Sequence, residues 1–475
     1  MTTPATTDRP SNDRSPIEGS DSGHSASGRA ATGDAASGRS KSGHSASTSG
    51  QSAPGQSAPG RLDSGRPDRG RRAPGRPSSG HPDPGRTNAP EPDRSAIEAA
   101  LAGLPRVVDL LAARAEEHDR DATFPYQGIE AVHEAGLLTL TVSPRYGGPG
   151  GTLADTVRVL AQLGRGDASV AVVTAFTLLR HAEQARSAGW PTAGYRRLLS
   201  ESRRGPALVT TLRAEPGGGA AGAAGSAGAD GLPATVARRD GDGWLLTGRK
   251  TYCTGAEALA WMAVTARTDE PEPRVGTFLV RGESEGLEID PTWDQLGLRA
   301  SASHDVVLDG VRVPAELALG LGAPGSQDHA EAELARAWQD LALAAVAIGV
   351  ARAAESWLVR FLSQRTPANL TEPLGTLPRY RCALGEIEAQ LIGAEELVEG
   401  LAPRVDRGEP DAVARTGPAQ VLATRAATAA VQQAVALTGN PGLSQFGIRH
   451  QDAKQQTEYD SELYLEWIFY WYVAT

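Results

Sequence analysis

The spacing of apolar residues changes twice along this chain, and these changes constrain its fold more than any other feature. After Ser95, apolar side chains recur every three to four residues, beginning with Ile97 and Leu101, which is typical of helices. From residue 206, short runs rich in Val, Thr, Leu and Trp alternate with Gly, Asp and Pro, which predicts antiparallel strands. From residue 326 the Ala- and Leu-rich helical pattern returns. Because helices and strands are segregated along the chain, the sequence predicts an α+β fold rather than a doubly wound parallel sheet.

This pattern predicts five parts. They are a disordered low-complexity tail (1–94), an N-terminal helical domain (95–205), a middle antiparallel β domain (206–325), a C-terminal helical bundle (326–444) and an atypical C-terminal segment (445–475). Predicted helices lie near 127–136, 153–163, 167–186, 341–361, 382–401 and 411–437, and predicted strands near 207–212, 234–237, 243–247, 260–266, 276–280 and 303–308. We expect Ser95 and Glu98 to form a capping box at the first helix, and Asp167 to cap the helix over 167–186.

The N-terminal tail is too poor in apolar side chains to fold. Residues 1–95 contain only three large ones, Met1, Ile17 and Leu62, so the tail cannot bury enough surface to offset chain entropy. This stretch has a net charge of +3, and the rest of the chain has −13. A body this acidic is a poor binder of nucleic acid, because attraction to phosphate dominates such affinity.

Cysteine content and hydropathy indicate the compartment. Two cysteines, Cys253 and Cys382, exclude a disulfide framework and a zinc site built on cysteines. The N-terminus lacks a charged and then apolar leader, and no run of 18 apolar residues occurs. We therefore expect a cytoplasmic protein that does not insert into a membrane.

No catalytic motif can be recognised from local sequence alone. Residues 217–222 match the dinucleotide pattern G-x-G-x-x-G, but Glu215-Pro216 interrupt the preceding strand and the following Gly/Ala run is a poor helix former. No nucleophile elbow, phosphate loop or paired metal-binding histidines is present. This pattern fits an enzyme whose reactive group is a bound cofactor, and it fits a binding or structural protein equally well.

Several segments, in their order and spacing, resemble the acyl-CoA dehydrogenase superfamily over about residues 96–444. The matching segments are Gly136-Leu137-Leu138, Pro144-Arg145-Tyr146-Gly147-Gly148, Asp167-Ala168-Ser169, Glu215-Pro216-Gly217, the run 242–256 (DGWLLTGRKTYCTGA), Leu296-Gly297-Leu298-Arg299-Ala300-Ser301 and Val311-Arg312-Val313-Pro314. The resemblance implies an N-terminal helical domain, a middle β domain and a C-terminal four-helix bundle, with FAD between the last two, in a homodimer or homotetramer. It also implies α,β-desaturation of an acyl-CoA thioester, with hydride transfer to flavin N5 and onward transfer of electrons to an electron-transfer flavoprotein.

The resemblance also implies which residues contact the cofactor. Tyr252 and Thr254 match positions against the flavin ring, and Leu212 and Ala214 match the strand whose backbone reaches its pyrimidine edge. Arg365 matches an arginine that reaches the diphosphate of a neighbouring subunit's FAD, although the family's following Phe-Gly is replaced by Pro367 and Ala368. If 252–254 is a strand, Tyr252 and Thr254 share one face and Cys253 lies on the other.

The family's catalytic glutamate is absent from both places where the family has one. The bundle-helix position holds Gln339-Asp340, and the C-terminal position falls near Glu462, in a segment that does not resemble the family. A desaturase needs such a base, whereas a reduced-flavin monooxygenase of the same superfamily does not. An FAD-dependent dehydrogenase, a monooxygenase and an inactive member therefore all stay open.

The last 31 residues differ from the rest in composition. Eight of the chain's 23 aromatic residues fall in 445–475, and no arginine follows Arg449. The run 467–473 (WIFYWYV) is apolar on all sides, unlike a surface helix. We expect this segment to be foreign to the fold and poorly packed; the alternative is a divergent helix that buries its aromatic residues.

Overall fold

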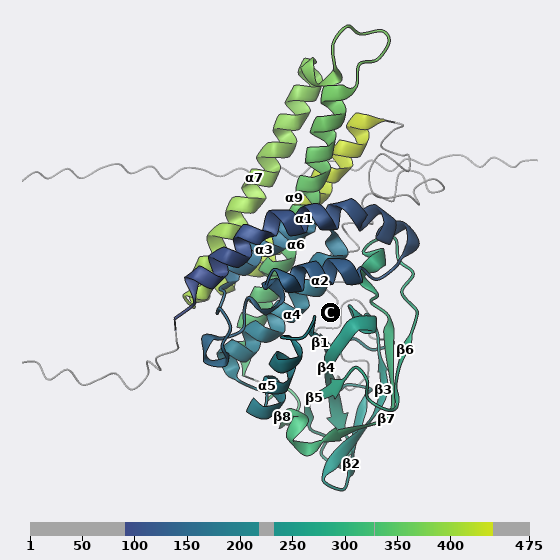
Figure 1. Ribbon diagram of the computed structural model, residues 1–475. Coiled ribbons are helices and arrows are strands. Elements are labelled where there is room, and N and C mark those ends of the chain that lie inside the picture. Colours follow the sequence, from purple (N-terminus) through teal and green to yellow (C-terminus); the bar gives the residue numbers. More distant parts are fainter. Residues whose placement is uncertain (1–90, 218–231, 327, 440–475) are drawn as a thin grey trace, which may run out of the picture. The chain divides into compact units, whose positions relative to one another are not determined.

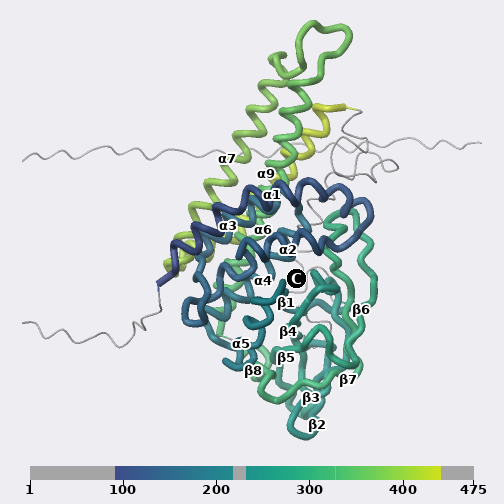
Figure 2. Tube along the Cα trace, in the orientation of Figure 1, coloured from purple at the N-terminus to yellow at the C-terminus, as the bar shows by residue number. Residues whose placement is uncertain are grey.

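The computed structural model describes residues 91–217, 232–326 and 328–439. The tail expected over 1–94, except for its last four residues, and the segment expected over 445–475 lie outside the described residues. The Gly/Ala run after Gly217 does so as well. Figure 2 traces the chain in sequence colours.

The described residues form helices, strands and helices in that order, as predicted. The helices are α1 (Arg94–Asp121), α2 (Tyr126–Glu134), α3 (Leu153–Gly166), α4 (Ala168–Ser187), α5 (Thr192–Glu201), α6 (His329–Gln364), α7 (Pro378–Asp406), α8 (Pro410–Val413) and α9 (Thr416–Thr438). The strands are β1 (Leu208–Leu212), β2 (Val236–Asp240), β3 (Gly243–Lys250), β4 (Leu259–Thr268), β5 (Val275–Arg281), β6 (Leu287–Asp290), β7 (Asp305–Pro314) and β8 (Ala318–Gly322). The sequence did not predict α5, β6 and β8, which are short and carry few apolar residues.

Side-chain caps set the starts of the N-terminal helices. Asp167 caps α4 as expected, accepting a hydrogen bond from Val170 N at 3.0 Å. The expected cap at Ser95 is wrong: Asp93 caps α1, accepting from the backbone N–H groups of Ser95 and Ala96 at 3.1 Å each. Ser95 is not the cap because it already lies within α1, where its hydroxyl donates to Asp93 at 2.7 Å.

The strands form one mixed sheet in the order β6-β7-β3-β2-β4-β5-β8, with β1 paired to β4 (Figure 1). Most neighbouring strands are antiparallel, as predicted, but β4 runs parallel to both β1 and β2. The long β3–β7 pair carries an irregularity between Leu246 and Thr247. The sheet therefore places the end of β3 beside the start of β7.

Close helix packing joins the two helical regions. A Cβ atom on Gly164 of α3 would lie 2.7 Å from the Val346 carbonyl oxygen, and one on Gly349 of α6 would meet the Ala161 carbonyl oxygen. Glycine at both positions lets the two helix backbones approach closely. Helix α6 also packs on α7, α9 and α4, and α3 packs on α7. Within the described residues, the C-terminal bundle thus consists of the long helices α6, α7 and α9 with the one-turn α8, and α3 packs beside them.

Helix α6 is long and apolar enough, by composition alone, to be considered as a membrane span. However, 56% of its most apolar stretch is buried within the protein. Such burial is typical of the central helix of a bundle.

Candidate flavin site

The segment that follows β3 leaves the sheet and folds against the turn before β7. The backbone N–H of Cys253 donates to His304 O at 2.9 Å, and the N–H of Gly255 donates to Ser301 O at 2.9 Å. Tyr252 has a φ of 56°, a left-handed conformation that a tyrosine rarely adopts. The expected strand over 252–254 is therefore wrong, because β3 ends at Lys250 and these backbone bonds turn the chain away.

This turn gives Tyr252 and Thr254 different surroundings. Tyr252 is 41% exposed and packs edge-on against Trp293, with ring centroids 6.3 Å apart. Thr254 is buried, and so is Cys253 between them. Burial raises the pKa of the Cys253 thiol well above its usual value, so this thiol stays protonated.

Three buried hydroxyl groups form a chain that ends at Thr254. Ser303 Oγ donates to Thr254 Oγ1 at 3.1 Å, and the Ser301 and Ser303 hydroxyl oxygens lie 2.7 Å apart. A hydroxyl group has one hydrogen to donate and two lone pairs that accept. Because Thr254 accepts from Ser303, its own hydrogen is left to donate to another group.

The end of β1 lies beside this turn. Thr251 N donates to Ala214 O at 3.0 Å, so the backbone near Leu212 and Ala214 reaches the segment that carries Tyr252. The Leu212 side chain is buried in the core, which leaves its backbone as the group available for a ligand. The structure therefore brings together four of the five expected cofactor residues.

Arg365 is the fifth, and it lies elsewhere. It is exposed and follows the last residue of α6, where its carbonyl oxygen accepts from Leu374 N at 2.9 Å. The turn between α6 and α7 lies at the end of the bundle away from the sheet (Figure 1). Within one chain, Arg365 thus stands apart from the other four residues.

A buried ion pair, not predicted from the sequence, joins the segment after β1 to the end of β3 beneath this turn. Lys250 Nζ lies 2.6 Å from Glu215 Oε1, and neither side chain has any exposed surface. Glu215 also accepts from Thr235 N at 2.9 Å and from Thr235 Oγ1 at 2.6 Å. Burial alone would raise the pKa of Glu215, but Lys250 and these hydrogen bonds hold it below its usual value. The predicted strand over 243–247 ended before Lys250, so nothing in the sequence indicated that this lysine is buried.

A polar network borders the Tyr252 side of the site. Trp293 N donates to His304 Nδ1 at 3.1 Å, which places the imidazole hydrogen on Nε2. His304 Nε2 lies 3.2 Å from Glu257 Oε1, and the Tyr126 hydroxyl donates to the same carboxylate at 3.4 Å. These contacts fix the position of Trp293 and hence of the ring that packs against Tyr252.

The α6 positions expected to carry a catalytic base hold no free carboxylate. Asp340 is buried and its Oδ2 accepts from Thr416 Oγ1 of α9 at 2.9 Å. Burial raises the pKa of Asp340. Gln339 is neutral and lies four residues before Leu343, which contacts Phe176 of α4, so these two α6 residues share a face. The carboxylate is thus directed at the bundle, and the neutral amide lies on the α4 side.

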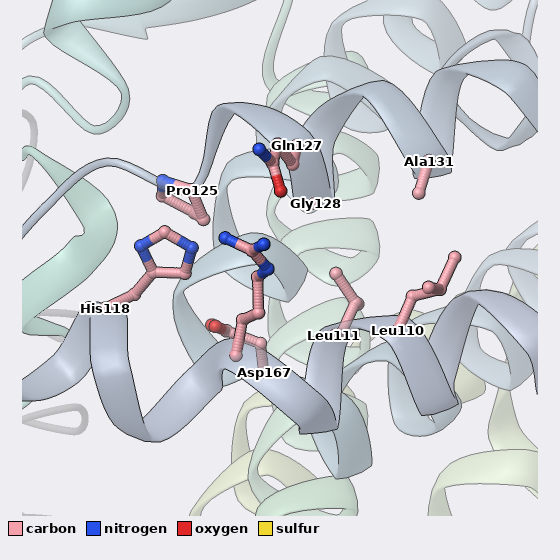
Figure 3. Close-up of a pocket in the computed structure, with 9 residues that line it drawn as sticks. Leu110, Leu111, His118, Pro125, Gln127, Gly128, Ala131 and Asp167 are labelled. Carbon is pink, nitrogen blue, oxygen red and sulfur yellow. The ribbon is translucent and has the colours of Figure 1, made fainter.

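A separate pocket lies among α1, α2 and the start of α4 (Figure 3). Leu111, His118, Gln127 and Asp167 are among the residues that line it. None of the expected cofactor residues belongs to this pocket. Across 91–217, 232–326 and 328–439, no group of three or more His, Cys, Asp or Glu side chains is arranged to hold a metal ion.

Comparison with known proteins matches this architecture domain by domain. The N-terminal, middle and C-terminal domain models of acyl-CoA dehydrogenase match residues 107–185, 213–311 and 341–447. YdbM, an acyl-CoA dehydrogenase-type protein of Bacillus subtilis (strain 168), is 28% identical over 71% of this chain and 86% of its own length. The amino sugar nitrososynthase RubN8 of Streptomyces rubradiris is 31% identical over 66% of this chain and 72% of its own length.

A solved structure shares the fold as well. KijD3 in complex with FMN and dTDP-3-amino-2,3,6-trideoxy-4-keto-3-methyl-D-glucose has a TM-score of 0.61 and 25% identity, covering 77% of this chain and 90% of its own. The family thus includes dehydrogenases and nitrososynthases on one fold. The chain belongs to the acyl-CoA dehydrogenase family of flavoprotein oxidoreductases.

Proposed function

We propose that this protein is a flavin-dependent oxidoreductase in which Thr254 donates a hydrogen bond to the flavin ring. The supporting observation is the hydroxyl chain from Ser301 through Ser303 to Thr254, which leaves the Thr254 hydrogen without an acceptor in that chain. A ring placed against this nearly buried hydroxyl would exclude water from it, and a hydrogen bond is stronger away from water.

The surrounding residues suit a planar, polar ring. Tyr252 presents an exposed aromatic side chain, and Trp293 supports it from the side. The β1 backbone at Leu212 and Ala214 supplies polar groups for the pyrimidine edge. A bound flavin would supply hydride acceptance or, when reduced, oxygen activation.

We propose FAD as the flavin and a homodimer or homotetramer as the assembly. Arg365 is exposed at the end of the bundle, where it is free to reach the diphosphate of FAD in a second subunit. FMN is the competing cofactor, since KijD3 was solved with FMN. Chromatography of the released flavin distinguishes FAD from FMN.

We also propose that the protein is located in the cytoplasm.

For the reaction, we propose α,β-desaturation of an acyl-CoA thioester, with electrons passed to an electron-transfer flavoprotein. Membership of the family and the similarity to YdbM support this assignment. The reaction needs a carboxylate to remove the α-proton, and a desolvated carboxylate has the required basicity. In the described part of α6 neither Gln339 nor Asp340 supplies one toward α4.

Reduced-flavin monooxygenation is the second candidate, and the neutral Gln339 favours it. A monooxygenase does not have to remove an α-proton, so an amide at this position is compatible with its activity. The similarity to the nitrososynthase RubN8 points in the same direction.

An anaerobic titration of the purified protein with butyryl-CoA tests both candidates. Bleaching of the oxidised-flavin absorption supports desaturation. An unchanged spectrum favours monooxygenation, because butyryl-CoA then passes no electrons to the flavin. A protein that holds no flavin contradicts both.

A further inference from the structure

Three arginines gather where α4 meets β1 and the start of α6. Thr177 of α4 bonds the backbone of Val209 in β1, accepting from its N–H at 3.2 Å and donating to its carbonyl at 3.4 Å. Three residues further along α4 lies Arg180, and four residues further along the chain from Val209 lies Arg213. Arg186, near the end of α4, contacts the start of α6 through Glu331. These arginines come from two elements of one junction.

The local carboxylates do not satisfy this cluster. Arg180 pairs with Glu183, and Arg186 pairs with Glu331 at 3.2 Å. Glu183 and Glu331 are thus each paired with another arginine, and Arg213 has no carboxylate partner of its own in the described part of the chain.

Hydrogen-bond donors are also left over. Arg180 Nε and Arg186 Nη1 are buried without a hydrogen-bond partner. Buried donors without partners are uncommon in native proteins, because each costs the free energy of losing water. These two donors have no exposed surface, so they contribute positive charge to the junction rather than a direct contact to a ligand.

Arg213 has the properties of a ligand contact rather than a structural residue. No hydrogen bond or ion pair joins it to the described residues. Its side chain is exposed, yet protein surrounds it closely enough for desolvation to lower its pKa, with Glu183 and Arg180 acting on its charge. This combination places the guanidinium in a recess open to solvent.

The recess adjoins the flavin site. Arg213 immediately precedes Ala214, whose carbonyl accepts from Thr251 in the turn that carries Tyr252 and Thr254. On the other side, Phe176 of α4 contacts Leu343, which shares a face of α6 with Gln339. Arg213 therefore lies next to the turn that carries Tyr252 and Thr254, and Arg180 lies one helical turn after the α4 residue that contacts α6.

We propose that Arg213, with Arg180 behind it, binds an anionic oxygen group of the substrate, a carboxylate or a phosphate. This inference names the substrate class of the redox site and rests on the proposed function. A neutral acyl chain would leave the positive charge of Arg213 without a partner.

Two ligand pairs test the proposal on the flavin-loaded full chain by titration calorimetry. The members of each pair differ in an anionic group: glutaryl-CoA carries a carboxylate that butyryl-CoA lacks, and dTDP carries a diphosphate that thymidine lacks. We expect the anionic member of at least one pair to bind about tenfold more tightly, as for one charged hydrogen bond. The pair that shows the preference identifies the anion.

Variants decide whether this junction is responsible. R213Q should remove the preference, and R213K, which keeps the charge, should retain part of it. R197Q is the matched control, because Arg197 is an exposed arginine of α5 and its substitution should leave the preference intact. Wild-type protein without a preference in either pair overturns the proposal, and so does a preference that persists in R213Q.

The two proposals fail in different ways. Wild-type protein that cannot be loaded with flavin would contradict the proposed function, whereas flavin-loaded protein that shows no preference would contradict only the role of Arg213. The unfolding midpoint of R213Q should match that of the wild type, since Arg213 bonds no described residue.

Discussion

Ser303 Oγ donates a hydrogen bond to Thr254 Oγ1 at 3.1 Å, and the two residues lie 49 positions apart in the chain. This bond orients the hydroxyl that we assign to the flavin. Ser303 is therefore a positioning residue, because it acts on the flavin through Thr254.

Replacing Ser303 with alanine should weaken flavin binding by about tenfold, the usual effect of losing one hydrogen bond. The dissociation constant is measured by fluorescence as flavin is added to the stripped protein. S303T keeps the hydroxyl and should restore most of the affinity. If S303A holds flavin as tightly as the wild type, Ser303 does not orient Thr254.

The two cysteines should react very differently with a thiol reagent. Cys253 is buried with a raised pKa, whereas Cys382 of α7 is exposed. Iodoacetamide added to the native protein should label Cys382 alone, and urea should make both thiols reactive. Peptide mass spectrometry locates the label. Modification of Cys253 at the rate seen for Cys382 would show that the turn opens readily.

Removing one member of the Lys250–Glu215 ion pair should lower the free energy of unfolding more than removing both members. K250M leaves a buried carboxylate unpaired and should lower the free energy of unfolding by about 3–5 kcal/mol. The double variant K250M/E215Q removes both charges and should lose less. R197A, which breaks an exposed ion pair, should change the free energy of unfolding by less than about 1 kcal/mol. Urea unfolding measures all three, and a double variant less stable than K250M would contradict this account.

Lowering the pH should reduce the free energy of unfolding, because the His181 side chain is buried. This side chain is buried, its Nδ1 lies 2.8 Å from the Tyr195 hydroxyl, and burial lowers its pKa from 6.5 to about 3. Between these values the unfolded chain takes up a proton that the folded protein excludes. The free energy of unfolding should therefore fall by up to about 1.4 kcal/mol per pH unit as the pH drops below 6.5.

The variant H181Q tests this prediction, since glutamine does not titrate there. Its stability should depend less steeply on pH over the same interval, and H133Q on α2 is the control. Equal slopes for H181Q and the wild type would exclude His181 as the source.

The sequence predicted the order of elements well because apolar periodicity is a local property. Most helices and strands appear near their predicted positions, and Asp167 caps α4 as expected. The Ser95 cap was wrong because another good capping residue, Asp93, lies two positions earlier and begins the helix there. The strand over 252–254 failed because backbone bonds to Ser301 and His304 turn the chain there, and such distant partners are invisible to local pattern.

The candidate site was predictable only where family resemblance reached it. The resemblance proposed Tyr252, Thr254 and Ala214 as cofactor residues, and the structure places their segments side by side. The Ser303 hydroxyl and the Lys250–Glu215 pair were missed, because each joins residues far apart in sequence. Arg213 belongs to no recognised sequence motif, and only its surroundings in the fold distinguish it from other surface arginines.

The flavin content of the purified chain decides whether Thr254 belongs to a flavin site. We predict a yellow protein with about one flavin per chain, and T254A with a clearly lower content after the same purification. T254S keeps the hydroxyl and should match the wild type. A colourless wild-type protein that binds neither added FAD nor FMN, or a T254A variant that retains full flavin content, would contradict the account.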